Sequence, residues 1–490
     1  MRRLTVLLAG LVSAFALVPG GAALAGTQGA RAVLTHQGVV TRQDIPSRAA
    51  SETDTVVEPD VAVDPLDGRI AIAAAHDSRY SDGGAVDISV AWTRNGGRTW
   101  QHKPIRGITK AAGGTWARAS DPVLAFGPDG TAYLSVLAVS LKCPSAVVVL
   151  RSHDGGQHWS KPVYAHKSTS CAYSDDKNWL VVDRSKASPH YGRVYQFWTP
   201  FISRGNTAVG SPQVVRWSDD HGRTWSSTHN VLADNHGTQN SQPMILPNGT
   251  IVDTFYDYGA GWHVPDSVGG TPEAVGAKQR RVYAAPRAPI NAKGSVYAAT
   301  STDGGATWSR EHEVVNNAGG YAGGVRCCLF AADIDAVTHR MYVAYEGGVR
   351  DTDPVYLSWS SDGTQWSSPT QVSRGDRSGV QRVNVDVVAR AGHVYVSYGR
   401  RTDAEQSGGY VQQQLSSSGN GGRTFAAPVS IGPRSVLKYA AQAGGYFPGD
   451  YIGEALTPKR LYIVWAVSSK PPATSTSKYH QVIFGATLRP

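Results

Sequence analysis

The sequence predicts an all-β fold, a β-propeller of seven blades. Three observations predict it: a turn motif that occurs six times, seven apolar hairpins that alternate with it, and a composition rich in Gly and aromatic residues. The chain has 490 residues, among them 54 Gly, 22 Tyr and 13 Trp. The repeat is too long for a helical solenoid and suits blades of four strands.

The turn motif is a Ser or Thr, an Asp, a Gly and a closing Trp at fixed spacing. Its full form reads Ser-His-Asp-Gly-Gly-Gln-His-Trp at residues 152–159, and the other copies are 218–225, 301–308 and the looser 93–100, 360–366 and 418–425. An Asp or Asn side chain binds nearby backbone N–H groups, and Gly accepts a positive φ. The motif therefore predicts a hairpin turn, with the aromatic residue packed beneath the blade.

Seven apolar hairpins supply the inner strands in this prediction. They span residues 60–77, 121–140, 177–200, 242–257, 329–346, 384–400 and 451–466. If each motif joins two outer strands, the seventh blade needs residues 481–488 as its third strand. A strand at residues 32–41 then adds the fourth and closes the ring. Six blades is the alternative, which makes one hairpin an insertion.

One domain is expected over residues 26–490, with a long insertion at about residues 259–293 in the fourth blade. This segment contains Trp262, His263, Arg280, Arg281 and Arg287. A loop of this length is either a lid over a site or a solvated excursion, and the sequence leaves both open.

The N-terminus has the pattern of a secretory signal peptide. Arg2 and Arg3 precede an apolar run at residues 4–18, and Ala23-Leu24-Ala25 predicts cleavage near Ala25. No second long apolar stretch follows, so we expect a secreted protein with no integral membrane segment. Without the two arginines the net charge of +9 falls to about +7. The positive charge is spread over the chain, which is compatible with binding an acidic polysaccharide or with ordinary solubility. We expect a monomer that binds carbohydrate and does not bind nucleic acid.

The chain has four cysteines, and export permits disulfides. Cys143 ends the second strand of the second blade and Cys171 precedes the third blade on the same face, which predicts a bridge. The neighbours Cys327 and Cys328 either form a strained vicinal disulfide or remain two buried thiols.

Ligand sites in a propeller lie where first strands begin and second strands end, because several blades each contribute a side chain there. This rule selects a polar rim. It comprises Glu58, Asp60, His76, Asp77, Arg79, Asp82, Asp121, Asp176, Lys177, Asn240, Gln242, Tyr256, Asp257, Arg326, Glu346, Arg382, Asn384, Arg400, Arg401, Asp450 and Tyr451.

The turn motif resembles the Asp box, or BNR repeat, of the sialidases and related propeller glycosidases. In that family the box lies on the blade rim, so the resemblance implies the fold rather than the chemistry. Residues 76–80, His-Asp-Ser-Arg-Tyr, look like the stretch where sialidases place an Arg and then a general acid. The resemblance implies a ligand contact for Arg79 and the role of acid for Asp82.

Three departures from the family argue against a true sialidase. Sialidases open the first blade with Arg-Ile-Pro, whose Arg grips the substrate carboxylate, whereas residues 57–59 read Val-Glu-Pro. Residues 240–242, Asn-Ser-Gln, lack the Glu of the family's Asn-Glu-Ser-Gln. Residues 445–451 resemble only loosely the region that carries the nucleophilic Tyr. Sialic acid is therefore not the expected substrate.

The first hypothesis is a secreted, sialidase-like glycosidase not specific for sialic acid. Hydrolysis needs two carboxyl groups, and Asp82 facing Asp257 or Asp450 supplies them. The alternatives are a uronic-acid lyase that uses His76, Tyr256 and Arg382, or a non-catalytic propeller that binds glycan or protein. The expected substrate contacts are Arg79, Lys177, Asn240, Arg326, Arg382, Arg400 and Tyr451.

No cofactor is expected, although a structural Ca²⁺ is conceivable. Asp60, Asp121 and Asp450 fall at inner positions, and hard cations take carboxylate oxygens from several strands. Ordinary capping of strand ends is the competing interpretation.

Overall fold

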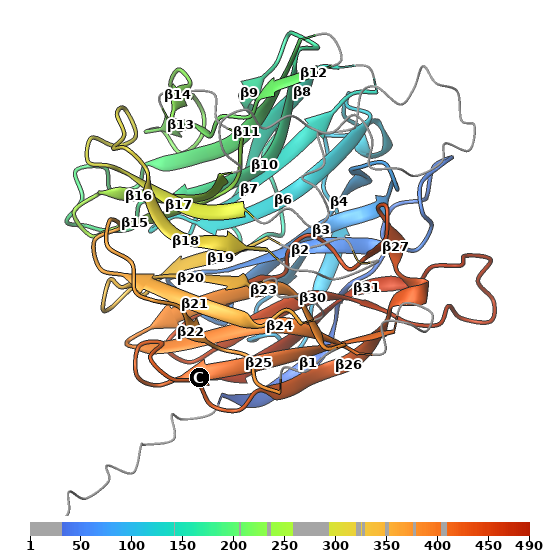
Figure 1. The fold of residues 1–490 in the computed structure, drawn as a ribbon. Coiled ribbons are helices and arrows are strands. Elements are labelled where there is room, and N and C mark those ends of the chain that lie inside the picture. Colours follow the sequence, from blue (N-terminus) through green and yellow to red (C-terminus); the bar gives the residue numbers. More distant parts are fainter. Residues whose placement is uncertain are drawn as a thin grey trace, which may run out of the picture.

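The computed structural model describes residues 32–490 except 142, 205–206, 233–236, 258–293, 320–324, 326–328, 348–351, 376–378 and 403–408. The described residues form strands β1 to β31 and two short 3-10 helices, η1 (Lys110–Ala112) and η2 (Leu437–Tyr439), with no α-helix among them (Figure 1). The predicted all-β class is confirmed. The predicted signal peptide, the insertion at 259–293, Arg326, Cys327 and Cys328 lie outside the described residues.

Most strands belong to antiparallel groups of four that follow the chain order. The first group is β2 (Val56–Val63), β3 (Ala71–Arg79), β4 (Ala85–Thr93) and β5 (Gln101–Pro104). The second is β6 (Arg118–Phe126), β7 (Ala132–Val139), β8 (Ser145–Ser152) and β9 (Val163–Lys167). A single pairing of Ala85 with Ala119 joins these two groups. The third is β10 (Tyr173–Val182), β11 (Val194–Arg204), β13 (Val214–Ser218) and β14 (His229–Asn230), with β12 (Thr207–Gly210) beside β11.

The remaining groups repeat this arrangement. The fourth is β15 (Thr238–Ile245), β16 (Ile251–Asp257), β17 (Gly294–Ser301) and β18 (His312–Ala318). The fifth is β19 (Ala331–Ile334), β20 (Met341–Glu346), β21 (Val355–Ser360) and β22 (Thr370–Gln371), and the sixth is β23 (Gln381–Arg390), β24 (His393–Thr402), β25 (Tyr410–Ser418) and β26 (Val429–Val436). The last is β29 (Gly453–Leu456), β30 (Leu461–Ser468), β31 (Gln481–Arg489) and β1 (Val33–Thr41); β27 (Ala441–Gln442) pairs with β28 (Tyr446–Phe447).

The two ends of the described chain meet in the last group. Strand β1 pairs antiparallel with β31, with Val33 opposite Arg489 and Gly38 opposite Gly485. The first strands of the groups also pack against one another in chain order, from β2 through β6, β10, β15, β19 and β23 to β29. Strand β29 in turn contacts β2. These contacts bring the bulged ends of the first strands, described below, toward one another.

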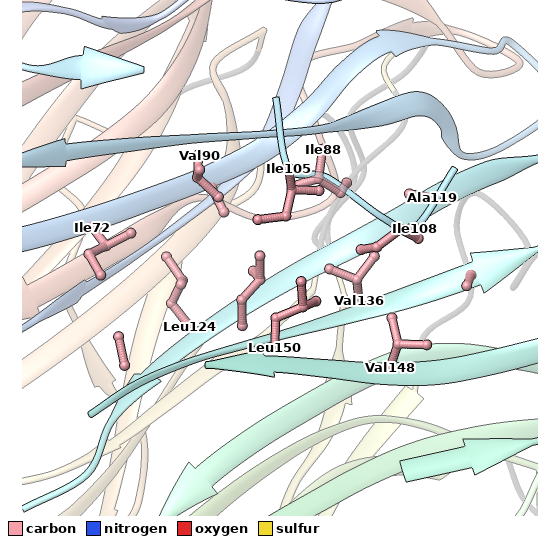
Figure 2. Packing of buried hydrophobic residues seen from close by; sticks show 14 of the residues in the cluster. Ile72, Ile88, Val90, Ile105, Ile108, Ala119, Leu124, Val136, Val148 and Leu150 are labelled. Carbon is pink, nitrogen blue, oxygen red and sulfur yellow. The ribbon is translucent and has the colours of Figure 1, made fainter. Parts of the chain in front are cut away.

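Apolar cores lie between neighbouring groups of strands. The largest is formed by β-branched and leucine side chains of the first two groups, such as Ile72, Ile88, Leu124 and Val136 (Figure 2). Equivalent clusters join the other neighbouring groups, including the last and the first through Val61 and Val464. Burial of such side chains contributes about 1.5–3 kcal/mol each, so the contacts between groups carry much of the stability.

The six turn motifs join the third and fourth strands, as predicted. In the full copy, Ser152 Oγ accepts the N–H of Gly156 at 2.9 Å, and Asp154 Oδ1 accepts the N–H of His158 at 2.9 Å. The Trp159 indole donates to the Gly156 carbonyl at 3.0 Å. Gly156 has a φ of 91°, and a Cβ there would lie 3.0 Å from Ile72 in the preceding group. The motif therefore fixes a turn and also packs on its neighbour.

Candidate functional site

Five first strands contain the same irregularity near their N-terminal ends. The pairing with the second strand shifts register there, and a non-glycine residue adopts a positive φ. These residues are Glu58 (φ 54°), Asp121 (48°), Lys177 (43°), Asn240 (66°) and Asn384 (54°). Non-glycine residues seldom occupy this region, and Asn and Asp tolerate it best. A bulge of this kind redirects a side chain, and here every redirected side chain is polar.

The bulge residues connect neighbouring groups of strands through hydrogen bonds to backbone. The Asn240 amide donates to the Phe330 carbonyl at 3.0 Å, and the Asn384 amide donates to the Gly449 carbonyl at 2.9 Å. The Asp450 N–H donates to Glu58 Oε1 at 3.4 Å. The bulges therefore bring the ends of several first strands into one polar cluster.

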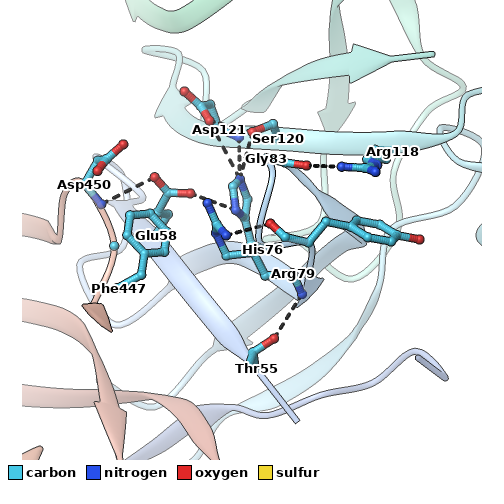
Figure 3. Close-up of polar contacts among 12 residues, drawn as sticks. Thr55, Glu58, His76, Arg79, Gly83, Arg118, Ser120, Asp121, Phe447 and Asp450 are labelled. Atoms are coloured by element: carbon cyan, nitrogen blue, oxygen red, sulfur yellow. Dashed lines mark hydrogen bonds and ion pairs between the residues drawn. The ribbon is translucent and has the colours of Figure 1, made fainter. Parts of the chain in front are cut away.

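His76 lies at the centre of the contacts between the first two groups (Figure 3). Its Nε2 accepts the backbone N–H of Asp121 at 2.7 Å, and its Nδ1 lies 2.7 Å from Glu58 Oε2. Because Nε2 accepts a hydrogen bond, the neutral ring carries its proton on Nδ1, facing the Glu58 carboxylate. Ser120 Oγ donates to Asp121 Oδ1 at 2.7 Å. His76 is 1% exposed. Its two ring nitrogens contact the bulge residues Glu58 and Asp121 and so connect the two bulges.

Lys177 and Tyr451 form the other half of the cluster. The Lys177 Nζ lies 3.8 Å from the centre of the Tyr451 ring and 4.7 Å from that of Trp179. The two side chains are 2% and 6% exposed. Within the described part of the chain, neither the Lys177 Nζ nor the Tyr451 hydroxyl has a hydrogen-bond partner. Buried polar atoms without partners are uncommon, and they mark places where a water or a ligand binds.

Four carboxyl groups determine the electrostatics of the cluster. Burial lowers the pKa of Lys177, and Asp121, Glu58, Asp450 and Asp60 oppose this effect. Burial, followed by repulsion from Glu58, raises the pKa of Asp121, and burial raises the pKa of Asp60 to about 6. Burial and the same four acids also raise the pKa of Tyr451. Four carboxyl groups thus act on the Lys177 ammonium.

Glu58, His76 and Asp121 are the described residues whose ligand atoms could hold a metal ion, but their contacts do not suit one. One atom each of Glu58, His76 and Asp121 lie within 4.8 Å of one another. Both ring nitrogens of His76, however, already have partners at 2.7 Å, in Glu58 and in the backbone of Asp121. The residues predicted for Ca²⁺, Asp60, Asp121 and Asp450, are instead the acids around Lys177. The Lys177 ammonium supplies positive charge at that position, and Ca²⁺ there stays a prediction.

The cluster unites four of the predicted site residues, His76, Lys177, Asp450 and Tyr451. Asp82, the acid implied by the family resemblance, lies apart from it. Its carboxylate is 60% exposed and forms an ion pair with Arg118 at 2.7 Å. Arg79 is buried; it donates to the carbonyls of Tyr80 and Gln442 and lies over the Phe447 ring. The two residues therefore contact different partners.

Two other predicted residues, Tyr256 and Asn240, lie near Phe330. The Tyr256 ring packs edge-on against Phe330 with ring centres 4.8 Å apart, and Asn240 binds the Phe330 carbonyl. Asp257 ends β16 opposite Thr238. Arg382 is fully buried and donates to the Arg374 carbonyl at 3.0 Å, and Arg400 lies opposite it in the sheet.

A cavity of about 1240 Å³ lies beyond the bulges, toward the C-terminal ends of the first strands. Residues from the first strands of all seven groups line it, including Asp60, Trp179, Gln242, Asp386 and Glu454. Burial raises the pKa of Glu454 to about 8, and Glu454 in turn helps to raise that of Asp386. The polar cluster therefore lies at the N-terminal ends of the first strands, and the cavity lies further along the same strands.

The disulfide between Cys143 and Cys171 is present, with a Cα–Cα distance of 5.3 Å, which confirms the predicted pairing. No helix in the described part of the chain is both long and apolar enough to cross a membrane.

Glu58 and Asp121, which the sequence placed on the rim without a catalytic role, prove central to the cluster. A signal for them exists, since a polar residue comes just before most of the apolar runs.

The comparisons with known proteins agree with the repeats. Residues 68–256 match a family model described as a BNR repeat-like domain, which confirms the predicted repeats over this part of the chain. No curated protein matches the chain.

Several solved structures are similar in overall arrangement. A protein of unknown function from Dyadobacter fermentans is 13% identical with a TM-score of 0.45, over 92% of this chain and 99% of that chain. An ulvan lyase, a polysaccharide lyase bound to a GlcA(1-4)Rha3S ligand, is 11% identical with a TM-score of 0.49, over 92% and 95%. The α-L-arabinanase of Penicillium chrysogenum with arabinobiose is 12% identical with a TM-score of 0.46, over 74% and 94%. Similarity at this level leaves the chemistry to be inferred from the residues of this chain.

Proposed function

We propose that the chain is a secreted, seven-bladed β-propeller that acts on carbohydrate at the bulged ends of its first strands. The blade count is supported by the groups of four strands and by first strands that contact one another in order and return from β29 to β2. Pairing of β1 with β31 supports closure of the ring by the N-terminal strand. The disulfide is consistent with export, and we propose a monomer.

The observation that carries the proposal is a pair of donors, Lys177 Nζ and Tyr451 Oη, that have no hydrogen-bond partner among the described residues and lie among carboxyl groups. Lys177 and Tyr451 offer an ammonium and a hydroxyl, while Asp121 and Asp450 offer acceptors. A sugar presents adjacent hydroxyl groups, each of which both donates and accepts a hydrogen bond. Such a ligand satisfies both kinds of group at once, and the Tyr451 and Trp179 rings add apolar surface.

The chemistry we propose is glycoside hydrolysis, with Asp121 as the general acid and Asp450 as the general base or nucleophile. Burial and Glu58 raise the pKa of Asp121, which keeps it protonated at higher pH than a free carboxyl group. Asp450 is only half-buried, so solvent and substrate can reach it. Glycoside hydrolysis needs a protonated carboxyl group on one side of the glycosidic bond and an ionised one on the other. The Lys177 ammonium interacts electrostatically with both groups.

The alternative of a uronic-acid lyase has less support at His76 and Arg382, and it stays open at Tyr256. A lyase needs an accessible Tyr or His and a cation that binds the uronate. His76 is 1% exposed with both nitrogens in contact with partners, and Arg382 is fully buried. A non-catalytic glycan-binding propeller uses the same cluster and is the second candidate.

Screening the purified mature chain against neutral, amino-sugar and acidic oligosaccharides tests the proposal. We expect cleavage of at least one neutral or amino-sugar glycan, and a loss of at least about 100-fold in turnover for Asp121→Asn and for Asp450→Asn. Asp219→Asn removes the same charge from a carboxylate that is 62% exposed and paired with Arg193, and it controls for total charge. Binding without cleavage supports the non-catalytic candidate. Unchanged turnover in both cluster variants contradicts the assignment of acid and base.

A further inference from the structure

Lys177 and Tyr451 place two hydrogen-bond donors beside each other in the polar cluster. The Lys177 ammonium lies over the Tyr451 ring, 3.8 Å from its centre, and the Tyr451 hydroxyl is attached to that same ring. Both side chains are buried, and among the described residues neither donor has a hydrogen-bond partner. Burying a donor without an acceptor costs free energy, so a ligand that brings an acceptor to this position is bound favourably.

The functional groups of a sugar differ in how well they serve these two donors. A hydroxyl group accepts a hydrogen bond but also brings a proton that needs an acceptor of its own. A carboxylate brings a negative charge, which Asp60, one of the acids that act on Lys177, repels once it is ionised. The carbonyl oxygen of an amide has two lone pairs, no proton and no net charge, so this one atom can accept from both Lys177 and Tyr451.

The other two parts of an acetamido group also find matching neighbours. Its N–H can donate to the carboxyl group of Asp60 or Asp121, both of which act on the pKa of Lys177. Its methyl group can pack on the Trp179 ring, whose centre is 4.7 Å from the Lys177 Nζ. Asp60 and Trp179 also line the cavity of about 1240 Å³, so the position lies next to open volume. Donors, acceptors and apolar surface thus occur together as an acetamido group requires.

We propose that the site recognises the N-acetyl group of hexosamine units in its glycan ligand. This inference rests on the proposed carbohydrate function and specifies its substrate class. The acetamido carbonyl accepts from Lys177 Nζ and Tyr451 Oη, and the methyl group packs on Trp179. The amide N–H donates to a carboxyl group of the cluster. Hydrogen bonds from a charged donor contribute more than neutral ones, so Lys177 supplies the larger share of the selectivity.

Calorimetric titration with three oligomers of equal length and the same glycosidic linkage tests the inference. The probes are oligomers of N-acetylglucosamine, of glucosamine and of glucose, which differ only in the substituent beside the anomeric carbon. We expect the N-acetylated oligomer to bind at least about tenfold more tightly than either of the others, because only its carbonyl oxygen serves both donors without adding a proton or a charge.

Equal or tighter binding of the glucose or the glucosamine oligomer overturns the inference, and so does failure of all three to bind. The carbohydrate function is decided separately by the wider glycan screen. It stands if another glycan binds or is cleaved there, and it fails if none does.

A conservative variant shows whether the two donors cause the preference. Tyr451→Phe removes the hydroxyl and keeps the ring over which Lys177 lies. We expect the ratio of the affinities for the N-acetylated and the glucose oligomer to fall about fivefold, since one hydrogen bond is lost from the first complex only. The matched control is Tyr395→Phe. Tyr395 is also buried and its hydroxyl also has no hydrogen-bond partner among the described residues, but it packs in the apolar core between the last two groups of strands.

The midpoint of thermal unfolding, measured for both variants, separates a loss of folding from a loss of binding. The control variant should keep the affinity ratio of the unaltered protein. An unchanged ratio in Tyr451→Phe with an intact fold contradicts the inference, and an equal fall in both variants does so as well.

Discussion

The ammonium of Lys177 lies against the face of the Tyr451 ring, 3.8 Å from its centre. Lys177 belongs to β10 of the third group and Tyr451 lies just before β29 of the last group, so the contact joins parts of the chain that are far apart in sequence. The ring attracts the cation without using any of its N–H donors. Lys177 is thereby held in position while its hydrogen-bonding capacity stays available to a ligand.

Replacing Lys177 with Met tests this arrangement directly. The surrounding carboxyl groups lose their counter-charge, so we expect glycan affinity to fall at least tenfold, as measured by calorimetric titration. Lys103→Met is the matched control, because the Lys103 Nζ also lies over an aromatic ring, 5.3 Å from the centre of Trp92, but outside the cluster. Equal loss in both variants would show that Lys177 acts through general charge only.

Asp253→Asn tests the cost of burying a carboxyl group. Burial raises the pKa of Asp253 to about 8, against 3.8 for the free side chain. The folded state therefore prefers the protonated form, and this favourable contribution is complete below about pH 4 and is lost as the pH rises to 8. Asn does not titrate and can still accept from Ser241 Oγ. We expect the variant to be more stable than the unaltered protein at pH 8, by about 1 kcal/mol or more, and the difference to shrink toward pH 4.

Urea denaturation at several pH values measures this difference. Asp220→Asn is the control with the opposite sign, because hydrogen bonds from Ser218, Arg223 and Thr224 lower the pKa of Asp220. Its stabilising contribution is present at neutral pH and is lost as the pH falls. The control variant is therefore expected to lose stability at pH 8 relative to low pH. A flat difference for Asp253→Asn between pH 4 and 8 would contradict the prediction.

The double variant Cys143→Ser with Cys171→Ser tests the disulfide. The bond closes a loop with a sequence separation of 28, and a cross-link of this length stabilises a protein by about 3 kcal/mol through the unfolded state. We expect a loss of that order in the free energy of unfolding, measured by urea denaturation. A reductant should destabilise the unaltered protein and leave the double variant unchanged. No difference between the two proteins without reductant would mean that the bond contributes nothing to stability.

Deleting residues 32–41 tests the role of β1. Strand β31 then loses its partner along Val33–Thr41, and its exposed edge becomes available to other chains. We expect a lower midpoint of thermal unfolding and concentration-dependent association, measured by calorimetry and light scattering. A separate peptide of residues 32–41 should restore part of the loss. An unchanged midpoint would contradict closure of the ring by this strand.

The strands and turns could be predicted from sequence because each depends on local patterns. The hairpin predicted at residues 384–400 appears as β23 and β24, and the turn at residues 152–159 forms the expected hydrogen bonds. Glycine and Asp at fixed spacing define such turns in any context. The outer half of the first six groups of strands therefore followed directly from the motif.

The cluster was harder to predict because its geometry depends on the bulges. A bulge adds one residue to a strand, so simple alternation assigns the following side chains to the wrong face. Glu58, at such a bulge, was therefore placed on the rim without a catalytic role. Asp82 lies in the turn between β3 and β4, where Arg118 pairs with it, and the family resemblance alone had favoured it. Contacts such as Lys177 with Tyr451 join distant segments, and no local pattern encodes them.

Each bulged first strand has two parts with different roles, a polar residue at the bulge and apolar residues that pack the sheet. At Asn384 the backbone sets the position of the residue, while the apolar residues that follow, such as Val387, hold the sheet against its neighbour. The side chain at the bulge is therefore largely independent of the packing below it. Glu58, Asp121, Lys177 and Asn384 show that acidic, basic and amide groups all occupy equivalent places in one chain. Substitutions at these places would therefore change the groups offered to a ligand while leaving the apolar residues that pack the sheets in place.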